Sequence, residues 1–160
     1  MEYIDIVDDN DQVIGRATRD EVNEKHLRCR IVHALVFNNK GEMAIHLRSA
    51  QRPFRPLHWS TAAGGFVQAG EKPEEAVKRE MEEEIGIDSP LNFLFKDWYY
   101  GLTGAQHLLN VYKTIHNGPF IIDPVEVERI EFFSLEKMRE MVLAGEKFHP
   151  ELLFLLNKYF

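Results

Sequence analysis

Two blocks near the start of the chain have the patterns of strands, each broken by a short polar cluster: residues 3–19 alternate hydrophobic and polar residues, and residues 29–49 carry hydrophobic, β-branched runs. In residues 3–19 the break is rich in Asp and Asn, and in residues 29–49 it is the sequence NNKG. Alternation with a period of two is typical of half-buried strands, and Asn, Asp and Gly favour tight turns. The pattern predicts two β-hairpins, with a short helix capped by Thr18 between them.

The middle of the chain changes from strand patterns to a helical pattern and back. Residues 60–71 are small and glycine-rich, which predicts strand or loop. Pro73 suits the first position of a helix and Gly86 its end, so a helix is expected over residues 73–85. Aromatic and β-branched runs then predict strands over residues 91–102, 105–115 and 127–133.

The end of the chain carries hydrophobic residues at helical spacing, with Ser134 and Pro150 as the expected helix starts. Strands grouped around one central helix, with two more helices at the end, bury their hydrophobic faces as a mixed β-sheet packed between α-helices. The predicted fold class is therefore α/β, with the layers of an α/β/α sandwich.

Composition and charge limit the functions that this fold can have. The chain has 160 residues, 44% hydrophobic and 28% charged, which predicts one domain over residues 1–160. A net charge of -7 argues against binding to nucleic-acid polymers or anionic membranes. Cys29 is the single cysteine, so no intramolecular disulfide is expected. The acidic start is unlike a signal peptide and no apolar run could span a membrane, which predicts a cytoplasmic protein.

An acidic stretch, residues 79–86 (REMEEEIG), is unexpected at the end of a helix. Glu80, Glu83 and Glu84 share one helix face, and like charges at this spacing repel each other. Carboxylates at a helix C-terminus also oppose the helix dipole. Taken alone, these residues leave two explanations open: a solvated acidic face, or a site that a cation neutralises.

The acidic stretch is part of a longer motif, GFVQAGEKPEEAVKREMEEEIGI, residues 65–87. The motif resembles the Nudix box: Gly, five residues, Glu, seven residues, Arg-Glu, an apolar residue, any residue, Glu-Glu, any residue, Gly and an apolar residue. Every fixed position matches, namely Gly65, Glu71, Arg79, Glu80, Glu83, Glu84 and Gly86. The resemblance implies a Nudix fold of the MutT-like type. It also implies cleavage of a nucleoside diphosphate, or another diphosphate, linked to a group X.

The Nudix resemblance further implies a divalent cation bound by the box carboxylates. Carboxylates are the hard oxygen ligands that suit Mg²⁺ or Mn²⁺. Glu80 and Glu84 are the expected first metal ligands, with Glu83 and the Gly65 carbonyl as companions. Glu71 is expected to contact a second ion or a metal-bound water.

Two roles in the chemistry remain to be assigned within the same motif. Arg79 is expected to hold a ligand carboxylate in place, with Glu83 within helical reach, rather than to bind substrate. The base that deprotonates the attacking water is left open between Glu80, Glu83 and a loop acid such as Glu126, with Glu80 ranked first.

Residues 3–133 also resemble the Nudix branch that contains isopentenyl diphosphate isomerase and its hydrolase-like bacterial relatives. Isomerases of that type carry an acid/base cysteine just before the box glycine, where this chain has Gly64. They also use metal-binding histidines, where this chain has Phe66 and Cys29. Because the acid/base group is missing and the hydrolase glutamates are complete, an isomerase-like enzyme is the lesser alternative.

A proline-broken loop carries three arginines, Arg48, Arg52 and Arg55. Arginine forks bind phosphate oxygens at two points, and the first two match diphosphate-binding positions of the isomerase relatives. The three are the candidate substrate-binding residues, the alternative being a solvated basic loop. His33, His46 and His107 lie in predicted strands and are expected to be packed and hydrogen-bonded, with no assigned role.

The sequence thus predicts a metal-dependent hydrolase in which water attacks a phosphorus of a small-molecule diphosphate substrate. The alternative from another class is a Nudix-fold module that binds a nucleotide or diphosphate without cleaving it. Specificity in such a fold lies in loops and pocket shape, so the motif does not identify group X. A homodimer that buries an exposed aromatic strand surface is also compatible with the pattern.

Overall fold

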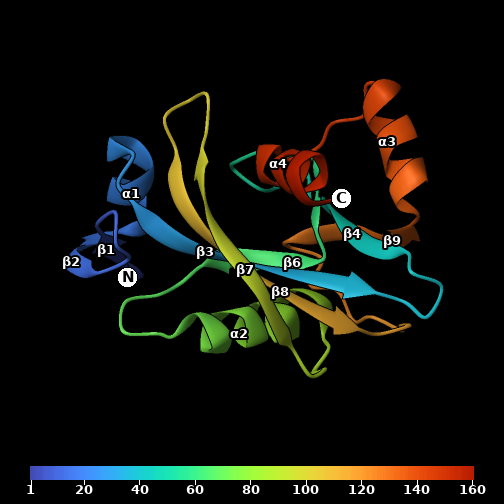
Figure 1. Ribbon diagram of the computed structural model, residues 1–160, viewed down its shortest axis with the longest axis horizontal. Coiled ribbons are helices and arrows are strands. Elements are labelled where there is room, and N and C mark those ends of the chain that lie inside the picture. Colours follow the sequence, from blue (N-terminus) through green and yellow to red (C-terminus); the bar gives the residue numbers. More distant parts are fainter.

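The computed structural model describes residues 1–160 and has a mixed sheet with helices on both faces (Figure 1). The strands are β1 (Tyr3–Val7), β2 (Val13–Thr18), β3 (Cys29–Phe37), β4 (Met43–Arg48), β5 (Trp59–Thr61), β6 (Ala63–Phe66), β7 (Asn92–Tyr100), β8 (Gln106–Ile115) and β9 (Val127–Phe133). The helices are α1 (Arg19–Lys25), α2 (Pro73–Ile85), α3 (Leu135–Leu143) and α4 (Pro150–Tyr159). In Figure 1, α2 lies below the sheet and the other helices lie above it, which confirms the predicted α/β/α layers.

Strand β3 is at the centre of the sheet. On one edge it pairs in parallel with β8 from Cys29 to Phe37, along its whole length. The other edge is shared in succession by β1 at Cys29, by β6 at residues 31–34 and by β4 at residues 36–37. β4 also pairs with β5 and β9, and β7 pairs with β8. This topology sets the glycine-rich strand β6 against the middle of the central strand β3.

The predicted hairpin strands are present, but the second hairpin is not a simple pair. β1 and β2 pair across the Asp/Asn turn, whereas β3 and β4 share only the pairs Val36↔Ala44 and Phe37↔Met43. Eight of the nine residues of β3 are buried. Because layers of side chains cover both of its faces, β3 lacks the alternation of a half-exposed strand and takes partners on both edges. The β-branched runs predicted the strands of this hairpin but not these partners.

The helix ends follow signals that the sequence carries. Thr18 closes a capping box at the start of α1, and the Ser134 side chain caps α3. α2 begins at Pro73 and ends where Gly86 adopts a left-handed conformation with φ 66°. None of the helices is long and apolar enough to cross a membrane.

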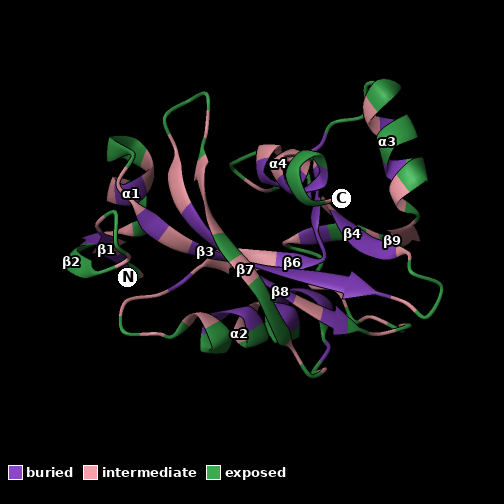
Figure 2. Cartoon of the chain, in the orientation of Figure 1, coloured by how far each residue is buried: buried purple, intermediate pink, exposed green.

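Two hydrophobic cores lie on opposite faces of the sheet, and Figure 2 shows the buried residues concentrated in its central strands. One core is shared with α1, α3 and α4 and includes Leu35 and Leu155. The other lies against α2 and includes Val32 and Met81. Successive residues of β3 enter opposite cores, as expected for a strand. α2 is therefore fixed on the sheet with one face turned towards β6.

A buried polar cluster joins α4 to the sheet. Glu151, in the first turn of α4, is 5% exposed and lies 2.9 Å from Nε2 of His33 and 3.0 Å from Nδ1 of His107. Burial alone would raise the pKa of Glu151, but the hydrogen bonds from His107 and His33 outweigh burial and hold this pKa well below its usual range. His33 and His107 are thus hydrogen-bonded within the fold.

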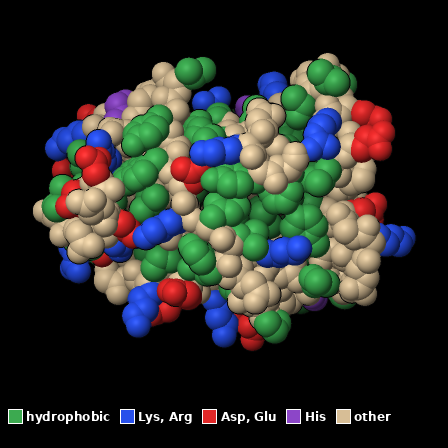
Figure 3. Space-filling model, viewed as in Figure 1, with side chains coloured by type: hydrophobic (Ala, Val, Ile, Leu, Met, Phe, Trp, Pro, Cys, Tyr) green, Lys and Arg blue, Asp and Glu red, His purple; other side chains and the backbone are tan.

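The outer face of β7 exposes large hydrophobic side chains. Phe93 is 55% exposed, Leu94 40% and Tyr100 60%. Figure 3 shows hydrophobic side chains gathered on this side of the molecule, interspersed with lysine and arginine. β7 pairs only with β8, so it is an edge strand with one row of backbone groups open to solvent.

Candidate active site

Two consecutive glycines of β6 are surrounded differently. A Cβ on Gly65 would lie 2.4 Å from Oε1 of Glu80, and a Cβ on Gly64 would lie 2.6 Å from the backbone oxygen of Val32. Gly64 therefore permits close pairing with β3, and Gly65 permits close approach to α2. The Gly64 N–H also donates a hydrogen bond of 2.9 Å to Oε1 of Glu84. The glycine-rich segment is thus what brings the backbone up to the acidic helix.

Glu80 and Glu84 lie one helical turn apart on the face of α2 that meets β6. The Glu80 side chain is 14% exposed and Glu84 is 4% exposed. Burial raises the pKa of Glu80 to about 7, although the neighbouring Arg79 lowers it. Burial, followed by the charge of Glu80, raises the pKa of Glu84 to about 8. Glu80 and Glu84 are thus not a solvated acidic face, and poorly solvated carboxyl groups with raised pKa values in a cleft are typical of a candidate functional site.

Arg79 contacts several of the acidic groups. Its Nε and Nη2 donate to the two carboxylate oxygens of Glu71 at 2.8 and 3.0 Å, and Nη1 donates to Oε1 of Glu80 at 2.9 Å. The contact with Glu83 is longer, at 3.4 Å, and the Glu83 side chain is 60% exposed. This geometry fits an orienting role for Arg79, exerted on Glu71 and Glu80 more than on Glu83.

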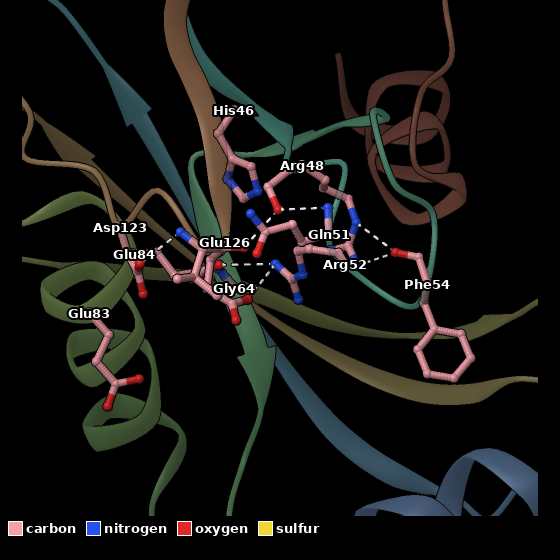
Figure 4. A network of polar contacts seen from close by, with 12 residues as sticks. His46, Arg48, Gln51, Arg52, Phe54, Gly64, Glu83, Glu84, Asp123 and Glu126 are labelled. Atoms are coloured by element: carbon pink, nitrogen blue, oxygen red, sulfur yellow. Dashed lines mark hydrogen bonds and ion pairs between the residues drawn. The ribbon is translucent and has the colours of Figure 1, made fainter.

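Two loops, one after β4 and one before β9, bring Arg52 and Glu126 beside Glu84 (Figure 4). Nη1 of Arg52 lies 3.0 Å from Oε2 of Glu126 and 3.5 Å from Oε2 of Glu84. Ser49 joins the two loops, because its N–H donates to the Glu126 carbonyl at 3.0 Å and its hydroxyl donates to the Val125 carbonyl at 2.6 Å. Arg52 therefore lies between a box carboxylate and a loop carboxylate.

The other two arginines of this loop are not brought to the box. Nε of Arg48 donates to the carbonyl oxygens of Phe54 and Arg55 at 3.1 and 3.0 Å, which folds the loop back on itself. Arg55 has a left-handed backbone with φ 51° and, like Arg48, does not line the acidic cleft. Of the three candidate substrate-binding arginines, Arg52 alone contacts a box residue.

The acidic groups line a cleft of about 350 Å³ with mostly polar walls. The residues in it that the sequence singled out are Arg52, Gly65, Arg79, Glu80, Glu83, Glu84 and Glu126. Arg19, at the start of α1, and Asp123, in the turn before β9, also line the cleft and were not predicted. In the sequence, Arg19 and Asp123 each resemble an ordinary surface residue. Only the fold shows that they line the same cleft as the box residues.

The chemistry of these side chains suits a hard divalent cation. The carboxylates of Glu80, Glu83, Glu84 and Glu126 line the cleft, and Gly65, whose carbonyl is the expected companion ligand, is also a lining residue. No three acidic side chains converge on one point in this arrangement. Arg79 contacts both Glu80 and Glu83, and Arg52 contacts both Glu84 and Glu126. The residues therefore fit Mg²⁺ or Mn²⁺ in type, provided that a guanidinium group moves aside.

Comparison with known proteins identifies the family. The NUDIX domain model matches residues 27–156. A Nudix hydrolase of Nostoc sp., all7351, is 31% identical over 100% of this chain and 96% of its own length. The Nudix hydrolase YfcD of Escherichia coli is 30% identical over 94% of this chain and 82% of its own length.

Solved structures agree with this result. The crystal structure of DR0079 from Deinococcus radiodurans has a TM-score of 0.85 and 26% identity, and the match covers 98% of both chains. The NUDIX domain of Shewanella oneidensis NrtR, solved with ADP ribose, has a TM-score of 0.63 at 16% identity, covers 89% of this chain and 97% of that one, and shows the fold alone. Nudix hydrolases cleave diphosphate linkages and generally use divalent metals. The chain belongs to the Nudix family and is a Nudix pyrophosphohydrolase.

Proposed function

We propose that this chain hydrolyses a small-molecule diphosphate linked to a group X, in a Mg²⁺- or Mn²⁺-dependent reaction in which water attacks a phosphorus atom. The observation that supports this most directly is a pair of carboxyl groups, the buried Glu84 and the mostly buried Glu80, set one turn apart against the backbone of Gly64 and Gly65. Placing two carboxyl groups so close together in a poorly solvated position is costly unless cations neutralise them, and the 3.5 Å contact with Arg52 leaves Glu84 with a raised pKa.

The proposed metal ligands are Glu80 and Glu84, assisted by Glu83 and the Gly65 carbonyl. When bound, the ion supplies positive charge for the phosphate oxygens and lowers the pKa of a coordinated water. Glu71 remains a candidate for a second ion or for a metal-bound water. Both of its oxygens accept hydrogen bonds from Arg79 in the present arrangement, so its contribution here is to hold that arginine.

The residues of the cleft then have distinct parts in hydrolysis. A carboxylate accepts a proton from the attacking water while the water oxygen forms a bond to phosphorus. The phosphoanhydride bond breaks, and the electron pair of that bond leaves with the departing phosphate. Glu80 is the proposed base, with Glu83 and Glu126 as the alternatives that mutation must separate. Arg52 is proposed to bind diphosphate oxygens, and Arg48 and Arg55 to support the same loop or reach group X.

The test is phosphate release from nucleoside diphosphate sugars, dinucleoside polyphosphates, NADH, nucleoside triphosphates and prenyl diphosphates, each with and without Mg²⁺. Turnover of a substrate that needs the metal and disappears in Glu83→Gln or Glu84→Gln supports the proposal. Tight binding without turnover across the panel would instead identify a non-catalytic nucleotide- or diphosphate-binding module. The complete set of box acids favours the enzyme, since a binding module does not need all of them.

An isomerase-like reaction is disfavoured by the backbone as well as by the motif. A Cβ at Gly64 would lie 2.6 Å from the backbone oxygen of Val32, so β6 has no room for an acid/base cysteine in this position. We expect no proton exchange into isopentenyl diphosphate.

We also propose that a second copy of the chain covers the exposed face of β7. This edge strand offers free backbone groups beside Phe93 and Leu94, which favours pairing with another strand. Sedimentation of the wild type should show a dimer, and Phe93→Glu should shift it to monomer. A monomeric wild type at high concentration would exclude this assembly.

A further inference from the structure

Arg52 lies where two carboxylates of the cleft would otherwise be free to bind a cation. Its Nη1 is within 3.0 Å of Glu126 and 3.5 Å of Glu84. The Arg52 side chain is 13% exposed and the Glu84 side chain is 5% exposed, so water screens this contact poorly. Figure 4 shows the guanidinium group beside both acids, while Glu83 is directed away from them.

The rest of the Arg52 guanidinium group is unengaged. Only Nη1 contacts protein carboxylates, and no protein acceptor is hydrogen-bonded to Nε or Nη2. Arg52 nevertheless lines the cleft. Its N–H groups beyond Nη1 are therefore available to phosphate oxygens, which a guanidinium group binds with two parallel hydrogen bonds.

Hydrogen bonds between the two loops hold the backbone near Arg52 in place. The Arg52 N–H donates to the Ser49 carbonyl at 3.3 Å, and Ser49 is bonded to the backbone of Val125 and Glu126. A change in the position of the guanidinium group thus needs only rotation of side-chain bonds, and not movement of the loop.

We propose that Arg52 is a built-in competitor of the divalent metal: its guanidinium group neutralises Glu84 and Glu126 until a metal displaces it, and the displaced group then binds the diphosphate. Arg52 contacts Glu84 and Glu126 through the same Nη1 atom, so a cation that bound both carboxylates would take the place of this group. The inference rests on the proposed metal dependence. It adds that metal binding prepares the substrate-binding arginine.

If Arg52 competes with the metal, one substitution should change two affinities in opposite directions. In Arg52→Gln the metal no longer competes with a cation, so affinity for metal should rise. The same variant lacks the phosphate-binding fork, so affinity for a diphosphate should fall. If Arg52 only binds substrate, Arg52→Gln should leave the metal affinity measured without substrate unchanged. If Arg52 only supports the loop, the substitution should lower that metal affinity.

The experiment is calorimetric titration of Mn²⁺ into metal-free protein without substrate. Arg52→Gln should bind Mn²⁺ at least about fivefold more tightly than wild type. Arg55→Gln is the matched control for the loss of one charge from the same loop, and its Mn²⁺ affinity should stay within about twofold of wild type. Arg52→Lys keeps the positive charge but lacks the guanidinium group, so its Mn²⁺ affinity should lie between those of wild type and Arg52→Gln. This variant replaces Arg52→Gln in the experiment if Arg52→Gln does not fold.

Methylene diphosphonate, which is not hydrolysed, is then titrated in the presence of saturating Mn²⁺. Its affinity should fall about tenfold or more in Arg52→Gln. If both Arg52 variants bind Mn²⁺ as tightly as wild type or more weakly, the proposed competition is wrong, but the proposed hydrolase function is not affected. Mn²⁺ binding in Arg52→Gln but not in wild type supports the competition, and no Mn²⁺ binding in any of these proteins overturns both proposals.

Discussion

Gly65 and Glu80 are so close that a single Cβ on Gly65 would lie 2.4 Å from Oε1 of Glu80. The atom in the way is the end of a flexible side chain, so Gly65→Ala should displace the Glu80 carboxylate without disturbing β6. We expect stability to change by less than about 1 kcal/mol in denaturant titrations. Mg²⁺-dependent turnover should fall about tenfold or more, because Glu80 is a proposed ligand and base.

The neighbouring glycine gives the opposite result and serves as the control. In Gly64→Ala the new Cβ meets the Val32 backbone oxygen at 2.6 Å, which cannot rotate away. This variant should lose about 2 kcal/mol or more of stability. Equal stability losses in the two variants would show that Gly65 is needed for strand packing rather than for the position of Glu80.

Arg79 and Glu71 should act as a unit. Arg79→Lys keeps the charge but loses the two parallel bonds to Glu71, so we expect a decrease in kcat of about 10- to 100-fold. Glu71→Gln should have a similar effect. The double variant should be little worse than either single one in steady-state kinetics, since each change releases the same side chain. Multiplicative losses would mean that Glu71 acts separately, for instance on a second ion.

Metal binding should release protons at neutral pH. Burial raises the pKa of Glu80 to about 7 and that of Glu84 to about 8, against 4.5 for an ordinary Glu. Both must be ionised to coordinate metal, so Mn²⁺ titrated near about pH 6.5 should displace protons. Calorimetry in buffers of different ionisation enthalpy measures their number. Glu84→Gln should release fewer, and an absence of proton release in wild type would contradict the raised values.

The same pKa values fix the sign of the stability change. A carboxyl whose folded pKa is raised contributes stability that is full below about pH 4.5 and is lost as pH rises through about 7 to 8. The free energy of unfolding of the metal-free protein, measured with urea in the presence of a chelator, should therefore decrease as pH rises from about 4.5 to about 8. Glu84→Gln should weaken less, because it has one raised carboxyl fewer.

Glu151 should matter for stability rather than for metal chemistry. Glu151→Gln leaves His33 and His107 without their shared carboxylate, and we expect a loss of about 3 kcal/mol in urea titrations. Mn²⁺ affinity should be unchanged. Glu140→Gln, on the exposed part of α3, is the control and should cost almost nothing. A loss below about 1 kcal/mol for Glu151→Gln would show that the cluster does not anchor α4.

Most of the fold could be predicted because its signals are local. Thr18, Pro73, Gly86 and Ser134 mark helix ends through interactions within a few residues, and alternation marks the exposed strands. The pairing of β3 with β8 could not be predicted in this way. It joins distant segments, and β3 is buried on both faces, so its pattern carries no information about its neighbours.

The same distinction applies to the site. The box residues lie close together in sequence, so their spacing identified them; it also placed Glu83 within reach of Arg79, whereas the shorter contacts of Arg79 are with Glu71 and Glu80. Arg19 and Asp123 enter the cleft from other parts of the chain, and nothing near them in sequence indicates a ligand. The place of Arg52 between Glu84 and Glu126 likewise depends on two loops that meet only in the fold.

The most direct test of the account is an anomalous difference map from crystals grown with Mn²⁺ and methylene diphosphonate. The account predicts a Mn²⁺ peak coordinated by Glu80 and Glu84, with the diphosphonate bound to the ion and to Arg52. A map with no peak at these carboxylates, and with the Arg52 contacts to Glu84 and Glu126 intact, would contradict it.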